Sequence, residues 1–364
     1  QGAVLLALET PIAAALGASA VVGLLVFTSV PLDVLASQMC GALDNWNLLA
    51  IPFFVIAGAV LGETGISRRL VALASALVGR MAGGLAIVTI VVSVFFAGIS
   101  GSGPADVAAI GLVLIPAMVA AGYGRGFSAA IMAAGGGLGI IIPPSIALIL
   151  FGVCAPANIR ALFLAGVLPG LLVAGALIAY VAWRFRGWKP CEESVPPPPL
   201  GRALAQASWG LLAPVIILGG IYSGLFTPTE SAAVAVMYAL AVDALVYHEL
   251  TWPALWRLLG DGAVTSAKVL IVVACASLFA FVMGVKCVPQ QAAQWIGGMN
   301  LSPWILLLAI NGALLAAGCF LDAVSIIYVL TPILMPMVSA AGIDPVHFGV
   351  IMIVNLAIGQ ITPP

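Results

Sequence analysis

The stretch GISGSGPAD, residues 98–106, interrupts an apolar part of the chain. It joins the run GGLAIVTIVVSVFFA to the run VAAIGLVLIPAMVAA. Glycine and proline do not favour a helix interior, and a carboxylate is costly to place in lipid. The stretch therefore predicts a polar turn between two apolar helices, held away from the lipid.

The composition predicts an all-α polytopic membrane protein. The 364 residues are 63% hydrophobic and 7% charged, with a mean hydropathy of +1.24, whereas a soluble domain has about 25% charged residues. The net charge of −1 gives no indication of nucleic-acid binding. The six cysteines and two histidines are scattered without the spacing of a metal site, and the cysteines are expected to be free thiols. Gln1 opens within an apolar stretch without a visible cleavable signal peptide, so we expect both ends to be trimmed.

Segments of about 20 apolar residues predict membrane-spanning helices. The candidates are 11–30, 46–64, 127–153, 161–183, 209–226, 230–247 and 263–286. Two further regions, 84–121 and 303–340, each consist of two apolar runs that meet at a polar or small-residue tip. Because each limb is short for a span, these regions predict re-entrant hairpins.

The distribution of basic residues predicts the orientation. The connector 184–202 holds four of the twelve Lys and Arg residues and is expected to be cytoplasmic. This places Arg68, Arg69, Arg80 and Arg125 on the same side, with the ends of the first hairpin. Five predicted crossings separate the two hairpins, and because five is odd, the hairpins open on opposite faces.

An internal repeat relates the two halves. A shift of 220 residues aligns IPAMVAAGYGRGFSAAIMAAGGGLGIIIPP, which ends at Pro144, with MPMVSAAGIDPVHFGVIMIVNLAIGQITPP, which ends at Pro364. The same shift places Ser102 of the first tip on Asp322 of the second. Together with the odd number of crossings, this predicts an inverted repeat, which is typical of secondary transporters with a substrate site near the midplane.

Both repeats end in a helix that is predicted to break. In GGGLGIIIPPS, residues 135–145, four glycines precede a double proline, which cannot continue a helix. The break frees backbone carbonyls at membrane depth, and a sodium ion coordinated by carbonyls and hydroxyls would replace the lost partners. The first predicted sodium site comprises Ser100, Gly101, Ser102, Gly103, Gly137, Gly139, Pro143 and Ser145. The second comprises Gly318, Asp322, Gly359, Gln360 and Thr362.

Further polar residues are candidates for other roles. Asp106 fits either a helix cap or direct coupling to the ion, and Arg125 fits a topology anchor better than a substrate ligand. Glu230 fits a helix cap, and Asp243 fits snorkelling or helix packing. The candidates for substrate binding or coupling are Pro104, Asp106, Arg125 and Ser325.

The motifs LLAIPFFVIAGAVLGETGISRRL, GISGSGPADVAAIG, GGGLGIIIPPSI, GLFTPTESAAVAVMYAL and GCFLDAVSIIYVLTPILMPM closely resemble the large membrane subunit (M, or DctM-like) of tripartite ATP-independent periplasmic (TRAP) transporters. The resemblance covers nearly the whole chain. It implies a sodium-driven elevator of the ion-transporter superfamily type in the bacterial inner membrane. It also implies two partners, a small membrane subunit (Q) and a soluble periplasmic binding protein (P). The implied cargo is an organic acid such as a C4-dicarboxylate or sialic acid, and the implied protein is not an enzyme.

This resemblance divides the chain into four predicted parts. Residues 1–80 and 184–290 would be scaffold halves, and 81–183 and 291–364 would be transport halves with one hairpin each. Family members usually continue past the second ITPP, so residues after Pro364 are expected to complete the second sodium site. The alternatives are a symporter that needs no binding protein, an ion channel built on re-entrant hairpins, an intramembrane enzyme, or a non-transporting scaffold.

Overall fold

The structure is a computed structural model that describes residues 10–28, 30–79, 81, 83–187, 199–298 and 302–362. Within these residues the regular secondary structure is helical, which confirms the predicted all-α class. The chain divides into two compact units. Unit 1 is Gln1–Leu49, Ile149–Leu162 and Ala263–Pro364, and unit 2 is Ala50–Leu148 and Phe163–Gly262. The assignment of scaffold and transport domains stays a prediction.

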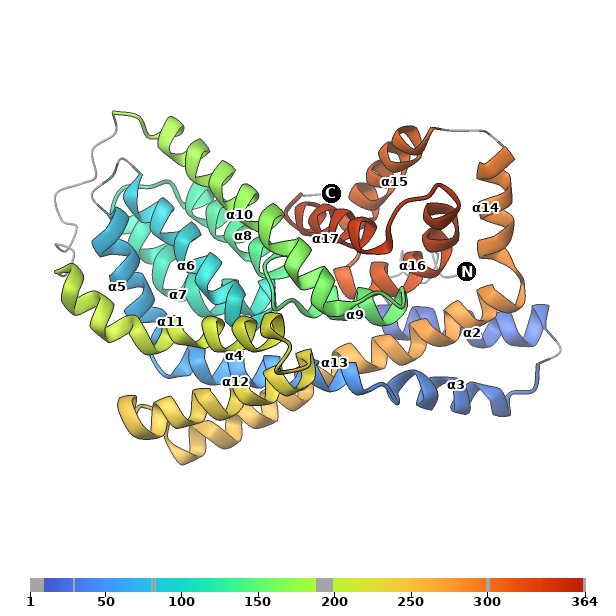
Figure 1. Ribbon diagram of the computed structural model, residues 1–364, viewed down its shortest axis with the longest axis horizontal. Coiled ribbons are helices and arrows are strands. Elements are labelled where there is room, and N and C mark those ends of the chain that lie inside the picture. The colour runs from blue at the N-terminus through green and yellow to red at the C-terminus, as the bar shows by residue number, and fades with distance from the viewer. Residues whose placement is uncertain are drawn as a thin grey trace. The chain divides into compact units, whose positions relative to one another are not determined.

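Unit 2 contains the first hairpin, as predicted for 84–121. Its two limbs are α6 (Gly84–Ser100) and α7 (Gly103–Ala120), and a turn of two residues joins them (Figure 1). The other helices that lie wholly or mainly in this unit are α4 (Ala50–Glu63), α5 (Ile66–Val78), α8 (Arg125–Ile141), α10 (Ile159–Arg184), α11 (Leu200–Ser223) and α12 (Pro228–Val242), which continues as the π-helical turn η2 (Asp243–Tyr247).

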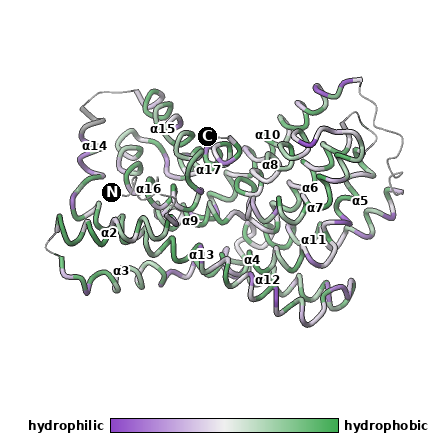
Figure 2. The backbone as a smooth tube through the Cα atoms, turned by 180° about the vertical axis from the view of Figure 1, so that it is seen from behind, coloured by the Kyte–Doolittle hydropathy of each residue, from purple (hydrophilic) through white to green (hydrophobic). Residues whose placement is uncertain are grey.

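The hairpin lies in the core of unit 2. Phe54 of α4, Phe96 of α6, Leu114 of α7 and Met132 of α8 are each at most 1% exposed. By contrast, Leu112 on α7 is 82% exposed, so this limb also has an apolar outer surface. Figure 2 shows hydrophobic residues, in green, along most of the length of the helices, as in helices that are surrounded by lipid.

Unit 1 contains the second hairpin, as predicted for 303–340. Its limbs are α15 (Pro303–Gly318) and α16 (Ala323–Ala340), and α17 (Pro345–Ile361) follows. The other elements wholly or partly in this unit are α2 (Ile12–Phe27), α3 (Asp33–Leu43), the short 3₁₀ helix η1 (Trp46–Leu49), α9 (Ile146–Cys154), α13 (Trp252–Val285) and α14 (Val288–Gly298).

Several helices begin or end at polar side chains that satisfy free backbone groups. Thr227 and Glu230 form a capping box at the start of α12, which confirms the predicted cap. Asp243 is 5% exposed and accepts hydrogen bonds from the backbone N–H groups of Glu249 (3.1 Å) and Leu250 (3.2 Å). Asp243 therefore does not snorkel; its buried carboxylate holds the turn that follows η2.

The lengths of the helices correct one expectation about the hairpins. Among the described residues seven helices are long and apolar enough to cross a membrane, and these include the limbs α7 and α16. These limbs, at 18 residues each, are thus not short for a span. The ends of each hairpin lie on one face whether its tip stops inside the bilayer or reaches the other side.

The number of crossings between the hairpins agrees with the sequence prediction. After the first hairpin, α8 and α9, bent by 42° at the break, count as one candidate span, and α10, α11, α12 with η2, and α13 are four more candidates. Counted by length and composition over the described residues, the number of candidate spans between the hairpins is odd, as predicted, and the opposite orientation of the hairpins stays a prediction.

We predict that the turns after the two hairpins label from opposite sides of the membrane. A methyl group added at Gly126 would meet no atom within 4 Å, and His347 is exposed, so cysteine fits at either site of a cysteine-free variant. An impermeant maleimide added to whole cells should react with His347→Cys, whereas Gly126→Cys should react only after permeabilisation. Labelling of both from the same side would rule out the inverted arrangement.

Candidate functional site

The first broken helix loses its hydrogen bonds at two prolines. Pro143 and Pro144 have no N–H, so the carbonyls of Gly139 and Ile140 lack the partners that an uninterrupted helix provides. The chain leaves the helix over residues 142–145 and resumes as α9. The Ser145 hydroxyl donates to the Ile140 carbonyl, and the Leu148 N–H donates to the Ser145 oxygen at 3.4 Å. We call residues 139–145 break 1.

The tip of the first hairpin lies directly against break 1. Gly101 ends α6 in the left-handed conformation (φ 64°), which glycine adopts without a steric penalty. Its carbonyl accepts a hydrogen bond from the Ile146 N–H at 3.2 Å, and a methyl group on it would lie 2.5 Å from the Pro144 carbonyl oxygen. The prediction that the polar stretch meets the broken helix is thus satisfied in the geometry of unit 2. We call residues 100–103 tip 1.

Asp106 is the charged residue of this site. Its side chain, in the first turn of α7, is 1% exposed and accepts a short hydrogen bond from the Ser100 hydroxyl. The second carboxylate oxygen, Oδ2, has no hydrogen-bond partner and lies against Gly139 of break 1. Asp106 is therefore not explained as a helix cap, because no backbone N–H of α7 is bonded to its side chain. A buried carboxylate with one unpartnered oxygen is favourable only if a proton or a cation joins it.

The other predicted residues of site 1 lie at different distances from the break. Gly103 packs against Gly136 and Gly139, and Gly137 is buried within α8. Ser102 is the N-cap of α7, but its side chain makes no capping hydrogen bond. Pro104 is exposed at the start of α7. Arg125 is exposed beyond the far end of α7, an 18-residue helix, and therefore about 27 Å from the tip.

The second site brings together two backbones. Gly318 at the end of α15 and Gly359 of α17 pack face to face, since a methyl group on Gly318 would lie 3.0 Å from the Gly359 Cα. Asp322 is exposed and caps α16, because its carboxylate accepts from the Ser325 N–H (3.2 Å) and hydroxyl (2.6 Å). Gln360 and Thr362 are exposed at the end of α17. The predicted Pro363–Pro364 break lies outside the described residues.

The duplication predicted from the sequence recurs in side-chain contacts. Gly111 faces Met132 in unit 2, and at the same shift of 220 residues the Thr331 hydroxyl lies 3.7 Å from the Met352 sulfur in unit 1. Ser102 and Asp322, also related by this shift, are both N-caps of the second hairpin limb. The two repeats therefore share their local backbone plan.

Two features of these sites were not predicted from the sequence. Gly58 of α4 supports tip 1 from behind, because a methyl group there would lie 2.9 Å from the Ser100 Cβ. In unit 1, the buried Asn355 amide donates to the Asn311 Oδ1 at 2.5 Å, and the Asn355 Oδ1 has no hydrogen-bond partner. Two asparagines in apolar helices are a signal that the sequence itself contained.

The described side chains that can ligate a metal ion are not clustered. Among the described residues, no group of three or more His, Cys, Asp and Glu side chains is placed to hold a metal ion. The fold and these two sites define an internally duplicated, α-helical, multi-pass membrane protein in which one hairpin tip meets an interrupted helix and the other packs against α17.

Comparison with known proteins identifies the family. The family described as "Tripartite ATP-independent periplasmic transporter, DctM component" matches residues 2–364. This chain belongs to that family, as the resemblance of its motifs predicted.

Three relatives and one solved structure illustrate the similarity. The isethionate TRAP transporter permease protein DctMQ of Oleidesulfovibrio alaskensis is 45% identical over 364 residues, which is 100% of this chain and 57% of that protein. The C4-dicarboxylate TRAP transporter large permease protein DctM of Rhodobacter capsulatus is 38% identical, covering 97% of this chain and 84% of that protein. The sialic acid TRAP transporter large permease protein SiaM of Vibrio cholerae is 40% identical, covering 94% and 80%.

The crystal structure of the Alcanivorax borkumensis YdaH transporter shares the fold at a TM-score of 0.62 and 15% identity. The match covers 93% of this chain and 79% of that one. At this identity the likeness concerns the fold alone.

We predict that alanine is not tolerated at two closely packed glycines, Gly101 of tip 1 against break 1 and Gly359 of α17 against Gly318. In Gly101→Ala the methyl group would meet the Pro144 carbonyl in a left-handed backbone, which costs about 1–3 kcal/mol. Gly359→Ala would force α15 and α17 apart. Both variants should lower the melting temperature of the purified protein, followed by tryptophan fluorescence.

The matched controls are Gly175→Ala on α10 and Gly312→Ala on α15, where the added methyl group meets no atom within 4 Å. These two should melt at or above the temperature of the unsubstituted protein. An equal loss in all four variants would mean that the close contacts of Gly101 and Gly359 do not determine the effect, because helix propensity alone favours alanine.

Proposed function

We propose that this chain is the large membrane subunit of a sodium-coupled secondary transporter that imports a small organic acid. The family is described as ATP-independent, so another source must drive accumulation. The observation that carries the proposal is the buried oxygen cluster of tip 1 and break 1, in which Asp106 Oδ2 has no hydrogen-bond partner.

Sodium suits this cluster because it supplies what the cluster lacks. The Asp106 carboxylate, the Ser100 hydroxyl and the carbonyls freed at Gly139 and near Pro144 are hard oxygen donors within one small region. A monovalent cation among them would neutralise the single buried charge and replace the helical hydrogen bonds lost at the prolines. Binding would also tie tip 1 to break 1, so the occupied site would be more ordered than the empty one.

The second sodium site would use the duplicated plan with different side chains. The close approach of Gly318 and Gly359 brings the backbone at the end of α15 next to that of α17, and the predicted break would follow there. Asp322, Gln360 and Thr362 would contribute oxygen atoms from the exposed side, together with residues that follow Pro364 in longer relatives. Ser325 would hold the Asp322 carboxylate in position through its two hydrogen bonds.

The substrate is proposed to be a small acid anion. The relatives are named for isethionate, C4-dicarboxylates, sialic acid and 2,3-diketo-L-gulonate, all of which carry an acidic group. The first turn of α7 is exposed at Pro104 and Ala105, and a helix N-terminus there offers free N–H groups and a positive dipole end to an anion. One hairpin from each repeat would contribute such a terminus.

Coupling then follows from charge. An uncompensated acid anion is too costly to move through the bilayer, whereas an anion accompanied by sodium ions is neutral or positive. We propose that the hairpins and broken helices move together as an elevator when loaded. The membrane potential contributes roughly 2.3 kcal/mol per 100 mV for each net positive charge moved.

Partners and location follow from the family. The word "tripartite" in its description supports a small membrane subunit and a soluble periplasmic binding protein as the other two components, in the inner membrane of a bacterium. The first relative bears the combined name DctMQ, and this chain covers 57% of its length, which leaves room for the small subunit in that protein.

We predict that Asp106→Asn and Ser100→Ala weaken sodium dependence. The full-length protein would be reconstituted with its small subunit and binding protein, and uptake of the acid measured against sodium concentration. Loss of one charge-assisted hydrogen bond, worth roughly 1.5–3 kcal/mol, should raise the half-saturating sodium concentration about tenfold or more. Ser128→Ala, at a buried serine of α8 bonded to the Gly124 carbonyl at 3.1 Å, is the control.

Two outcomes would contradict the proposal. Uptake that is equal in potassium and sodium would remove sodium as the coupling ion. Uptake or ion current without any binding protein would favour the symporter or the channel over the tripartite transporter.

We predict that Asp322 can be separated into its capping and coupling roles. Asparagine is as good an N-cap as aspartate, so Asp322→Asn should keep the melting temperature while Asp322→Ala lowers it. Both should lose sodium-dependent uptake if the carboxylate is part of the second site. Full uptake by Asp322→Asn would leave Asp322 with the cap alone.

A further inference from the structure

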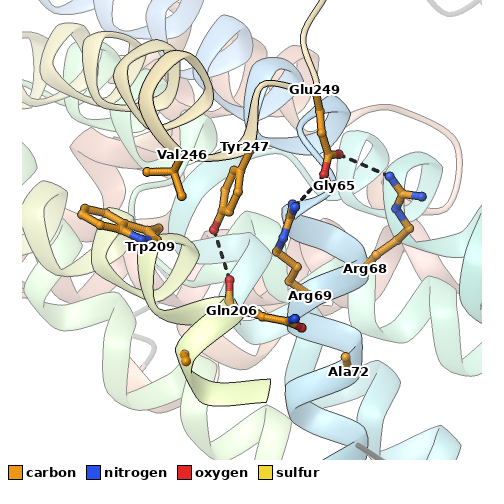
Figure 3. Close-up of a pocket in the computed structure, with 10 residues that line it drawn as sticks. Gly65, Arg68, Arg69, Ala72, Gln206, Trp209, Val246, Tyr247 and Glu249 are labelled. Carbon is orange, nitrogen blue, oxygen red and sulfur yellow. Dashed lines mark hydrogen bonds and ion pairs between the residues drawn. The ribbon is translucent and has the colours of Figure 1, made fainter. Parts of the chain in front are cut away.

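A second polar feature lies in unit 2, outside the two proposed sodium sites. A pocket of about 600 Å³ opens where the start of α5 meets α11 and the turn after η2. In Figure 3 one side of this pocket is charged, with Arg68, Arg69 and Glu249, and the other is aromatic and apolar, with Trp209, Tyr247 and Val246. The pocket thus presents the two chemistries that meet at a membrane surface.

The side chains of the two arginines are held by different numbers of contacts. Arg69 is fixed, because it donates to Glu249 at 2.6 Å and to the Thr64 carbonyl at 2.8 Å and lies 3.8 Å over the Tyr247 ring. The Arg68 side chain is 72% exposed and has one ion pair, at 3.3 Å, to the same Glu249. Most of the Arg68 guanidinium donors are therefore available to a ligand.

The charge of the pocket favours an anion. Two arginines face one glutamate, which leaves a net charge of +1. Both arginines lie at the start of α5, where the helix dipole is already positive, and the first turn of α5 contains no acidic residue. A planar guanidinium beside a fixed second positive charge suits the oxygens of a phosphate.

The apolar side of the pocket favours a lipid over a soluble anion. Trp209 is 42% exposed, and Leu212 and Val215, which follow it along α11, are 40% and 63% exposed. These exposed apolar side chains lie within two helical turns of the pocket on the same helix. A soluble phosphate would leave these apolar side chains uncovered, whereas the acyl chains of a phospholipid would cover them.

We propose that this pocket binds the headgroup of an anionic phospholipid, with Arg68 as the principal phosphate ligand and Arg69 as a fixed second charge. The arginine distribution places the pocket on the cytoplasmic side, where anionic lipids attract basic residues. The site belongs to unit 2 alone and does not depend on sodium coupling.

The test measures lipid-dependent stability of the purified full-length protein. Melting temperature would be followed while dioleoyl phosphatidylglycerol replaces dioleoyl phosphatidylcholine in mixed micelles. We expect stabilisation that saturates with phosphatidylglycerol, and in Arg68→Gln an about fivefold higher half-saturating fraction, as loss of one basic contact predicts. Arg68→Lys should retain most of the effect, because the positive charge remains.

Arg202→Gln is the matched control, since Arg202 is an exposed arginine of α11 that does not line the pocket. The proposal is overturned if Arg202→Gln weakens the response as much as Arg68→Gln, which would indicate general surface attraction. It is also overturned if soluble glycerol 3-phosphate reproduces the whole stabilisation, which would assign the pocket to a free phosphate compound.

Discussion

Two adjacent prolines in the middle of an apolar helix are the constraint on which the first site depends. Because Pro143 and Pro144 cannot donate hydrogen bonds, the helix must open at membrane depth, and the carbonyls before the break need other partners. Ser145 satisfies one of them within the break itself. The tip of the hairpin provides the rest of the environment, because the Gly101 carbonyl receives the Ile146 N–H at the point where the helix resumes. Tip 1 thus provides a hydrogen-bond acceptor that the interrupted helix lacks.

The contact of tip 1 with break 1 also buries a carboxylate. A glycine-rich tip closed on a broken helix creates a buried region, and the sequence places the Asp106 carboxylate in it. Asp106 has one oxygen bonded to Ser100 and the other against a glycine, where a larger residue would leave no space. A buried carboxylate of this kind is more stable when a proton or a cation joins it than alone. Asp106 is therefore both the buried charge that the fold must satisfy and the side chain on which the proposed coupling depends.

The hairpins, the break and the repeat were predictable because each depends on local sequence. A cluster of small and polar residues between two apolar runs favours a turn over a continuous helix, so residues 84–121 and 303–340 could be assigned as hairpins. The roles of side chains that depend on tertiary packing could not be predicted in the same way. Asp106 and Asp322 both lie near a tip, yet one is buried and the other is exposed and caps a helix. Only the way each limb packs on its neighbour decides between these outcomes, and no short motif encodes that packing.

The duplicated plan has diverged in its side chains, and this argues that the two sites are not equivalent. At the positions related by the shift of 220 residues, Gly135 of one repeat corresponds to Asn355 of the other. Gly135 packs against the unpartnered Ser93 hydroxyl, whereas Asn355 bonds to Asn311 across two helices. The first repeat thus combines small residues with a buried carboxylate, and the second combines amides with an exposed one. An ion in the first site would lose more of its water and depend more on the carboxylate, so the first site should discriminate more strongly among cations.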